Sequence, residues 1–119
     1  MNDIWAAAED YACRWLEERG WAVRARNFRT RRSEVDIVAR KGGILAFVEV
    51  KYASEGSTTR PLEKIDAEKR GRIVHGAMAY LSGSPPACEI RFDVAAVTGE
   101  PGSMRMSAYI QDAFRPDTM

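Results

Sequence analysis

Apolar residues recur at helical spacing in two parts of the chain, over residues 3–19 and 66–82. In the first part they are Ile4, Ala8, Tyr11, Ala12 and Trp15; in the second they are Ile73, Val74, Ala77, Met78 and Leu81. This spacing predicts two amphipathic helices. Residues that favour helix ends stand at the boundaries: Asn2 or Asp3, Gly20, Asp66, and Ser82 with Gly83.

Five other segments have the alternation or the apolar run of β-strands: residues 21–28, 34–40, 44–51, 89–97 and 106–111. In the first of these, Trp21 and Val23 would face inward and Arg24 outward. Between the second and third, Gly42 and Gly43 supply a tight turn, so this pair is predicted to be antiparallel.

The predicted order is α-β-β-β-α-β-β. A helix between the third and fourth strands indicates a crossover to a neighbouring parallel strand. We therefore expect an α/β fold with a mixed central sheet of about five strands flanked by helices. The 119 residues fit one domain over 1–119, with an ordered core over about 3–114.

Composition limits the environment in which the chain works. The chain contains no run of about 18 apolar residues, so no membrane span is predicted. Acidic residues stand at the N-terminus where a signal peptide has basic ones. Cys13 and Cys88 are far apart without metal-ligand spacing, and we interpret both as reduced thiols, with a disulfide as the alternative. These features predict a cytoplasmic protein that does not bind a membrane.

Charge is unevenly distributed although the net charge is only +1. Residues 24–72 contain 13 of the 18 Lys and Arg and 7 of the 17 Asp and Glu, a local net charge of +6. Five arginines fall within nine residues: Arg24, Arg26, Arg29, Arg31 and Arg32. A basic band of this kind is compatible with a phosphate-backbone partner, and a solvated surface is the alternative.

The segment "SEVDIVARKGGILAFVEVK", residues 33–51, places charged residues inside two predicted buried strands. Alternation puts Glu34, Asp36 and Val38 on one face of their strand and Val35, Ile37 and Ala39 on the other. On the next strand it separates Phe47, Glu49 and Lys51 from Ala46, Val48 and Val50. The Gly42-Gly43 turn brings Asp36 and Glu49 nearly level across the pair.

Two buried carboxylates that face each other need compensation. A divalent cation such as Mg²⁺ or Mn²⁺ could neutralise both, with the backbone carbonyl of Val50 as a further ligand. Lys51 would then lie beside an activated water. The alternative is a plain cross-strand salt bridge. The level carboxylates and the apolar flanks favour the metal site.

Asp36 followed thirteen residues later by Glu49-Val50-Lys51 resembles the PD-(D/E)xK nuclease signature. Further segments are similar to the YraN family of small Holliday junction resolvase-like proteins within that superfamily. They are "AEDYACRWLEERGWAVRARNFRTRRSEVDIVA", "FVEVKYAS", "DAEKRGRIVHGAMAYL", "RFDVAAV" and "DAF". Together they cover about residues 5–114. The resemblance implies a restriction-endonuclease-like fold with a helix on each side of a mixed sheet.

The resemblance also implies roles for individual residues. Asp36 and Glu49 match the metal-binding acids and Lys51 the catalytic lysine, while Glu9 looks like an acidic residue that resolvase-like members place near the metal. Glu34 belongs to the matching motif. The other candidates each have a structural alternative: Lys69 and Arg70 as phosphate contacts or a solvated helix face, and Arg91 with Asp93 as site support or an internal salt bridge. His75 is interpreted as structural.

The sequence departs from the family pattern at Ala8 and Ser33, where glycine is usual, and at Tyr52-Ala53, where Thr-Arg is usual. None of these changes removes a predicted metal ligand. The leading hypothesis is a Mg²⁺- or Mn²⁺-dependent nuclease acting on DNA, including branched or structured DNA, whose arginines position the backbone. The alternatives are a nucleic-acid-binding module without cleavage and a protein-interaction domain. Symmetric cutting of two strands would need a homodimer.

Overall fold

The computed structural model describes residues 3–54, 65–82 and 89–116. Its elements follow the predicted order: α1 (Ile4–Glu18), β1 (Ala22–Arg29), β2 (Glu34–Lys41), β3 (Ile44–Tyr52), α2 (Ala67–Ser82), β4 (Glu89–Thr98) and β5 (Arg105–Ile110). The predictions for Asn2, Gly83 and Cys88 fall outside the described residues.

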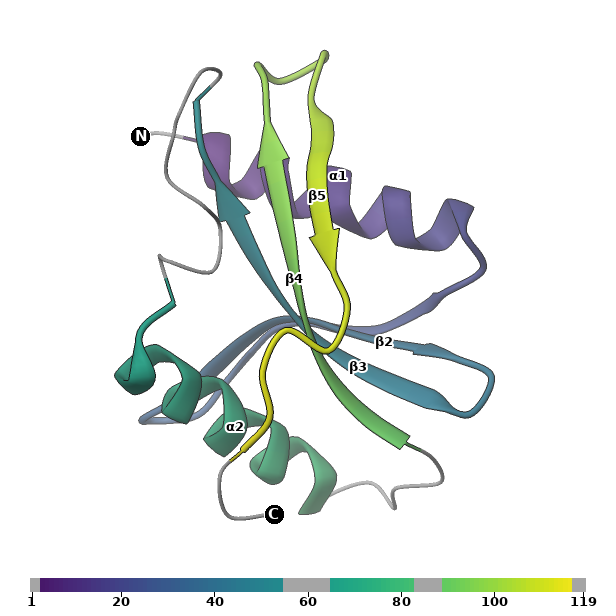
Figure 1. Cartoon of the computed structure of the whole chain (residues 1–119). Helices are drawn as coiled ribbons and strands as arrows, with labels where there is room; N and C mark the ends of the chain where they lie inside the picture. Colours follow the sequence, from purple (N-terminus) through teal and green to yellow (C-terminus); the bar gives the residue numbers. More distant parts are fainter. Residues whose placement is uncertain (1–2, 55–64, 83–88, 117–119) are drawn as a thin grey trace.

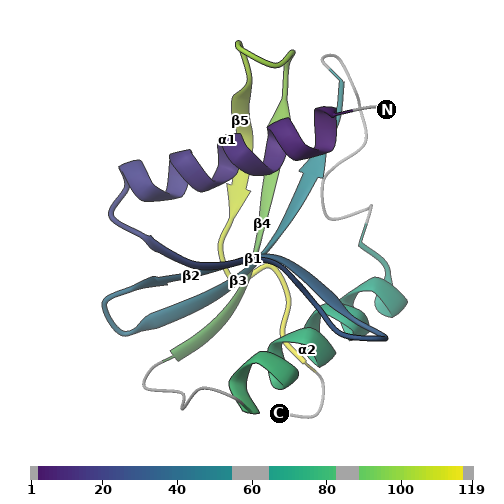
Figure 2. The ribbon, with the colours of Figure 1, turned by 180° about the vertical axis from the view of Figure 1, so that it is seen from behind.

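The strands form one five-stranded sheet in the order β1-β2-β3-β4-β5. Strands β3 and β4 are parallel, and all other neighbours are antiparallel. Parallel neighbours need a crossover connection. Between β3 and β4 this connection contains α2, as predicted. The two helices lie on opposite faces of the sheet (Figure 1, Figure 2). The mixed sheet with a helix on each face confirms the predicted α/β fold class and is consistent with a restriction-endonuclease-like fold.

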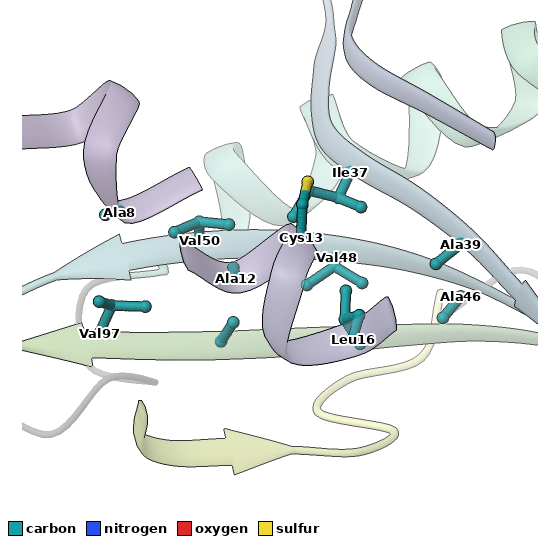
Figure 3. Packing of buried hydrophobic residues seen from close by; sticks show 11 residues of the cluster. Ala8, Ala12, Cys13, Leu16, Ile37, Ala39, Ala46, Val48, Val50 and Val97 are labelled. Carbon is teal, nitrogen blue, oxygen red and sulfur yellow. The ribbon is translucent and has the colours of Figure 1, made fainter. Parts of the chain in front are cut away.

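Helix α1 covers the face that the side chains of Val48 and Val50 enter (Figure 3). Ala8 and Ala12 are fully buried there, and their small side chains let the helix approach the strands closely. Gly20 ends this helical segment with a φ of +92°, as its position predicts. Asp3 stands at the N-cap, but its side chain makes no capping hydrogen bond.

Helix α2 begins with the predicted cap, because Asp66 Oδ1 accepts the Lys69 backbone N–H at 2.8 Å. Its buried row contains Ile73, Gly76 and Ala77. The sequence analysis also placed Met78 in this apolar stripe, and that prediction is wrong: Met78 is 52% exposed. The helix turns about 100° per residue, so a row centred on Ala77 directs the next side chain away from the sheet.

Gly76 is where α2 approaches the sheet most tightly. A Cβ at this position would lie 2.9 Å from Val35 Cγ2 and 3.5 Å from Ser33 Cβ. We therefore expect Gly76→Ala to lower the free energy of unfolding by about 1–3 kcal/mol, because the helix must shift outward. Urea denaturation measures this change. The matched control is Gly71→Ala, where nothing lies within 4 Å of the added Cβ; equal destabilisation by both substitutions would contradict the packing argument.

Strands β2 and β3 separate part-way along their length, and we call this place the fork (Figure 1). Their pairing extends from the Gly42 turn to Ile37 opposite Val48 and then stops. Beyond that point β2 continues beside β1, while β3 continues beside β4 as far as Tyr52. The fork therefore leaves the facing edges of β2 and β3 unpaired in the middle of the sheet, where strands are normally hydrogen-bonded on both edges.

The side chains of β2 change face near the fork. Val35 packs in the core beneath α2, whereas Ile37 and Ala39 pack beneath α1. The expected common face for these three residues is thus wrong. Opposite this part of β2, Asn27 of β1 has a φ of +50°, in the left-handed region that departs from regular strand geometry.

Candidate active site at the fork

Asp36 and Glu49 lie across the fork from each other, Asp36 on β2 and Glu49 on β3. They follow the last registered pair, Ile37 and Val48, and are therefore level, as the sequence predicts. Asp36 Oδ2 accepts the Val50 backbone N–H at 2.8 Å. The aspartate side chain thus takes the position of the missing strand partner and is directed toward Glu49.

Glu49 is a buried carboxylate with an incomplete set of partners. Its side chain is 3% exposed. Oε2 lies 3.2 Å from Lys51 Nζ and 3.4 Å from Lys69 Nζ. Oε1 is buried and has no hydrogen-bond partner. Because an unpaired buried oxygen is costly, this atom marks a place where a proton or a cation would be stabilised.

The pKa of the Asp36 carboxyl group is also raised in this environment. Burial raises its pKa, and the neighbouring Glu49 carboxylate raises it further, to about 8. The Val50 N–H acts in the opposite direction but is outweighed. In the absence of a metal, the raised pKa therefore favours the protonated form of the Asp36 carboxyl group at neutral pH.

An ion-pair chain connects the fork to the β1–β2 hairpin. Lys69 of α2 contacts Glu49 and also lies 3.6 Å from Glu34 Oε1. Arg29 Nε lies 3.5 Å from Glu34 Oε2. Lys69 therefore faces the site, whereas Arg70 is exposed. Glu34 acts by holding Lys69 and Arg29 together.

Glu9 approaches the pair from α1. It is half-buried, and its charge is the weakest of the causes that raise the pKa of Asp36. In the described parts of the chain, no three His, Cys, Asp or Glu side chains are close enough to form a metal cage. Glu9 thus lies beyond the close Asp36–Glu49 pair, and its role as a metal ligand stays a prediction.

The five arginines of the basic band have different surroundings. Arg24 is exposed, and Arg26 donates to Asp10 Oδ1 at 2.6 Å, which joins β1 to α1. Arg31 and Arg32 are exposed at the tip of the hairpin, where they line a cavity of about 360 Å³ together with Thr30 and His75.

His75 is exposed on α2 and lines that cavity, so it lies outside the buried row of the helix, and its interpretation as a structural residue stays a prediction. Sequence reasoning missed the cavity because it depends on how closely α2 approaches the hairpin. The glycine next to His75, Gly76, was the available signal for this approach.

Arg91 and Asp93 form the internal salt bridge that was one of their two interpretations. Arg91 donates two hydrogen bonds of 2.9 Å to the Asp93 carboxylate, which is completely buried. Tyr109 Oη and the Asp112 backbone N–H also donate to Asp93, at 2.7 and 2.9 Å. These four hydrogen bonds satisfy the carboxylate, so the network anchors β5 to β4.

Comparison with known proteins identifies the family. A family model described as "Uncharacterised protein family UPF0102" matches residues 8–97. The chain belongs to the UPF0102 family. This is the YraN family, within the restriction-endonuclease-like superfamily, as the sequence motifs indicated.

Relatives named UPF0102 protein match nearly the whole chain. One from Bacteroides thetaiotaomicron is 39% identical over 97% of this chain and 94% of its own length. Others, from Dechloromonas aromatica and Synechococcus, are 42% and 37% identical over 92% and 96% of this chain, and 87% and 92% of their own lengths. None of these names states an activity. No helix of the described residues has the length and hydropathy needed to cross a membrane.

Proposed function

We propose that this chain is a divalent-metal-dependent nuclease that hydrolyses phosphodiester bonds in DNA, with branched or otherwise structured DNA as the preferred substrate. The observation that carries the proposal is Glu49 Oε1, a buried carboxylate oxygen without a donor that lies beside Asp36.

The residues at the fork fit Mg²⁺ or Mn²⁺. Asp36 and Glu49 would hold the ion, with Glu9 and the Val50 carbonyl as further oxygen donors. Two carboxylates with water and substrate phosphate are the usual ligands of Mg²⁺ in enzymes that act on phosphate esters. When bound, such an ion lowers the pKa of a coordinated water and stabilises charge on the phosphate.

Two lysines complete the chemistry of the site. Lys51 Nζ is within 3.2 Å of Glu49 Oε2 and is partly exposed, so it can orient the attacking water or donate to a phosphate oxygen as charge develops. Lys69 contacts Glu49 from α2 and is itself held by Glu34. It therefore acts as a positioning residue for the Glu49 carboxylate.

The basic hairpin tip supplies the track for the DNA backbone. We expect Arg31→Ala with Arg32→Ala to weaken binding to all DNA sequences, and to reduce the slope of log affinity against log salt by about 2, because two phosphate contacts are lost. Fluorescence anisotropy at several salt concentrations measures the slope. The matched control is Arg19→Ala with Arg40→Ala, at the other end of the sheet; an equal change in that variant would contradict a localised track.

Cleavage of labelled DNA tests the function directly. The substrates are single-stranded, duplex, flap and four-way-junction DNAs of shared sequence, incubated with Mg²⁺, with Mn²⁺ or with EDTA. We expect metal-dependent cleavage that is fastest on the structured substrates. Absence of cleavage of every substrate with either metal would reject the nuclease.

One observation favours a second candidate, a DNA-binding module without cleavage. Lys51 and Lys69 beside Glu49, with a proton on Asp36, can balance the two carboxyl groups without any metal. Isothermal titration with Mn²⁺ separates the two functions. Heat of binding in the wild type that disappears in Asp36→Asn supports the nuclease, and no heat in the wild type supports the binding module.

A further inference from the structure

Trp5 is a large aromatic residue left open to solvent at the start of α1. Its side chain is 51% exposed. Among the residues that the structure describes, Met78 is the other large hydrophobic residue with comparable exposure. The two lie on different helices on opposite faces of the sheet (Figure 1). Within the described ranges, Trp5 is thus a single exposed ring and not part of a broad apolar patch. A protein partner would need such a broad patch.

The ring of Trp5 rests on a second ring that is fixed in place. Trp5 and Tyr52 meet edge to face, with centroids 6.2 Å apart and planes at 74°. Tyr52 Oη donates to the Gly99 carbonyl at 2.9 Å, and its backbone lies in the β3–β4 ladder. Tyr52 therefore holds Trp5 in one orientation while half of the indole stays accessible.

This aromatic pair stands next to the fork. Trp5 is one helical turn before Glu9 on α1, and one turn is about 5.4 Å. Tyr52 lies on the same face of β3 as Val50, whose backbone N–H is accepted by Asp36 at the fork. Both views of the fold place the start of α1 beside the end of β3 (Figure 1, Figure 2). A nucleotide whose phosphate is at the fork would bring its base, or that of its neighbour, to the indole.

We infer that Trp5, supported by Tyr52, is a stacking platform for an unpaired nucleobase of the DNA strand at the fork. Stacking on an aromatic ring tolerates any base, because every base has a π face, and it requires that the base be free of its complementary partner. This inference rests on the proposed function. It narrows the substrate to DNA that is unpaired next to the cleaved bond, as in a single strand, a flap or an open junction.

Binding measurements without cleavage test the platform. The probes are a labelled oligothymidylate and an abasic sugar-phosphate chain of equal length and charge, titrated in EDTA and followed by anisotropy. The wild type is expected to bind the oligothymidylate about 5- to 150-fold more tightly than the abasic chain, which is the range for stacking of one base. Trp5→Ala should abolish this ratio, and Trp5→Phe should keep most of it. The matched control, Met78→Ala, should leave it unchanged.

Three outcomes would overturn the inference: a wild-type ratio near one, a ratio that Trp5→Ala leaves intact, or an oligomer in sedimentation analysis that Trp5→Ala dissociates. The last would make Trp5 a contact with a second copy. Failure of the nuclease proposal gives a different result. A protein that cleaves no DNA can still bind the oligothymidylate more tightly than the abasic chain through Trp5. Conversely, metal-dependent cleavage by a protein whose ratio is near one would reject the platform alone.

Discussion

Glu49→Gln is expected to lower the rate of DNA cleavage by at least about 100-fold while the protein stays folded. The substitution replaces the charge of the proposed metal ligand with a neutral amide, so the proposed ion and the charge it would supply to the reaction would be lost. The amide keeps the shape of the side chain. Its oxygen can face Lys51 and Lys69, and its nitrogen can donate to Asp36 at the position of the unpartnered Oε1.

The control for this experiment is Glu68→Gln. Glu68 is an exposed glutamate on α2 that pairs with Arg72, so the same chemical change there should leave cleavage unaltered. Rates are measured under single-turnover conditions with Mn²⁺, and folding is checked by thermal melting. If Glu49→Gln cleaved at the wild-type rate, the fork would not be the active site. That result would also point to a contaminating nuclease in the preparation.

Asp36→Asn is expected to stabilise the metal-free protein at pH 8 by an amount on the order of 3 kcal/mol. The folded protein raises the pKa of Asp36 to about 8 from its ordinary value of 3.8. Between these two pH values the folded state keeps a proton that the unfolded state has released. The free energy of unfolding of the wild type therefore falls as pH rises from about 4 to about 8. Asparagine is neutral throughout and can still accept the Val50 N–H.

Urea denaturation in EDTA at several pH values between 5 and 9 measures this difference. Wild type and variant should be similar near pH 5 and diverge as pH rises. Asp112→Asn is the control, since Asp112 lies at the surface beside Arg115 and asparagine tolerates its positive φ. Parallel curves for wild type and Asp36→Asn would contradict the burial of a proton at the fork. Adding Mn²⁺ at pH 8 should stabilise the wild type and not the variant.

The elements and the level carboxylates could be predicted because they depend on short stretches of chain. Alternation and the Gly42 turn determine the β2–β3 register, and that register alone brings Asp36 opposite Glu49. The parallel placement of β4 follows from the helix that precedes it. In the same way, the Asp66 cap is a signal contained within four residues.

The features that were not predicted depend on tertiary placement. Val35 changes face in a part of β2 that lies opposite a left-handed residue of the neighbouring strand, and no pattern within β2 reveals this change. Met78 is exposed because only one row of α2 meets the sheet. The contact of Lys69 with Glu49 and the distance of Glu9 from the pair both depend on how two helices seat on opposite faces, and spacing along the sequence carries no information about that.

The fork has a consequence for how such a protein can vary. Both carboxylates belong to one continuous hairpin, thirteen residues apart, so their spacing is independent of either helix. The helices contribute the lysine, the third acid and the exposed indole. Substitutions on α1 or α2 can therefore alter the surroundings of the proposed site, and so the substrate that it would bind, without displacing the two acids of the hairpin.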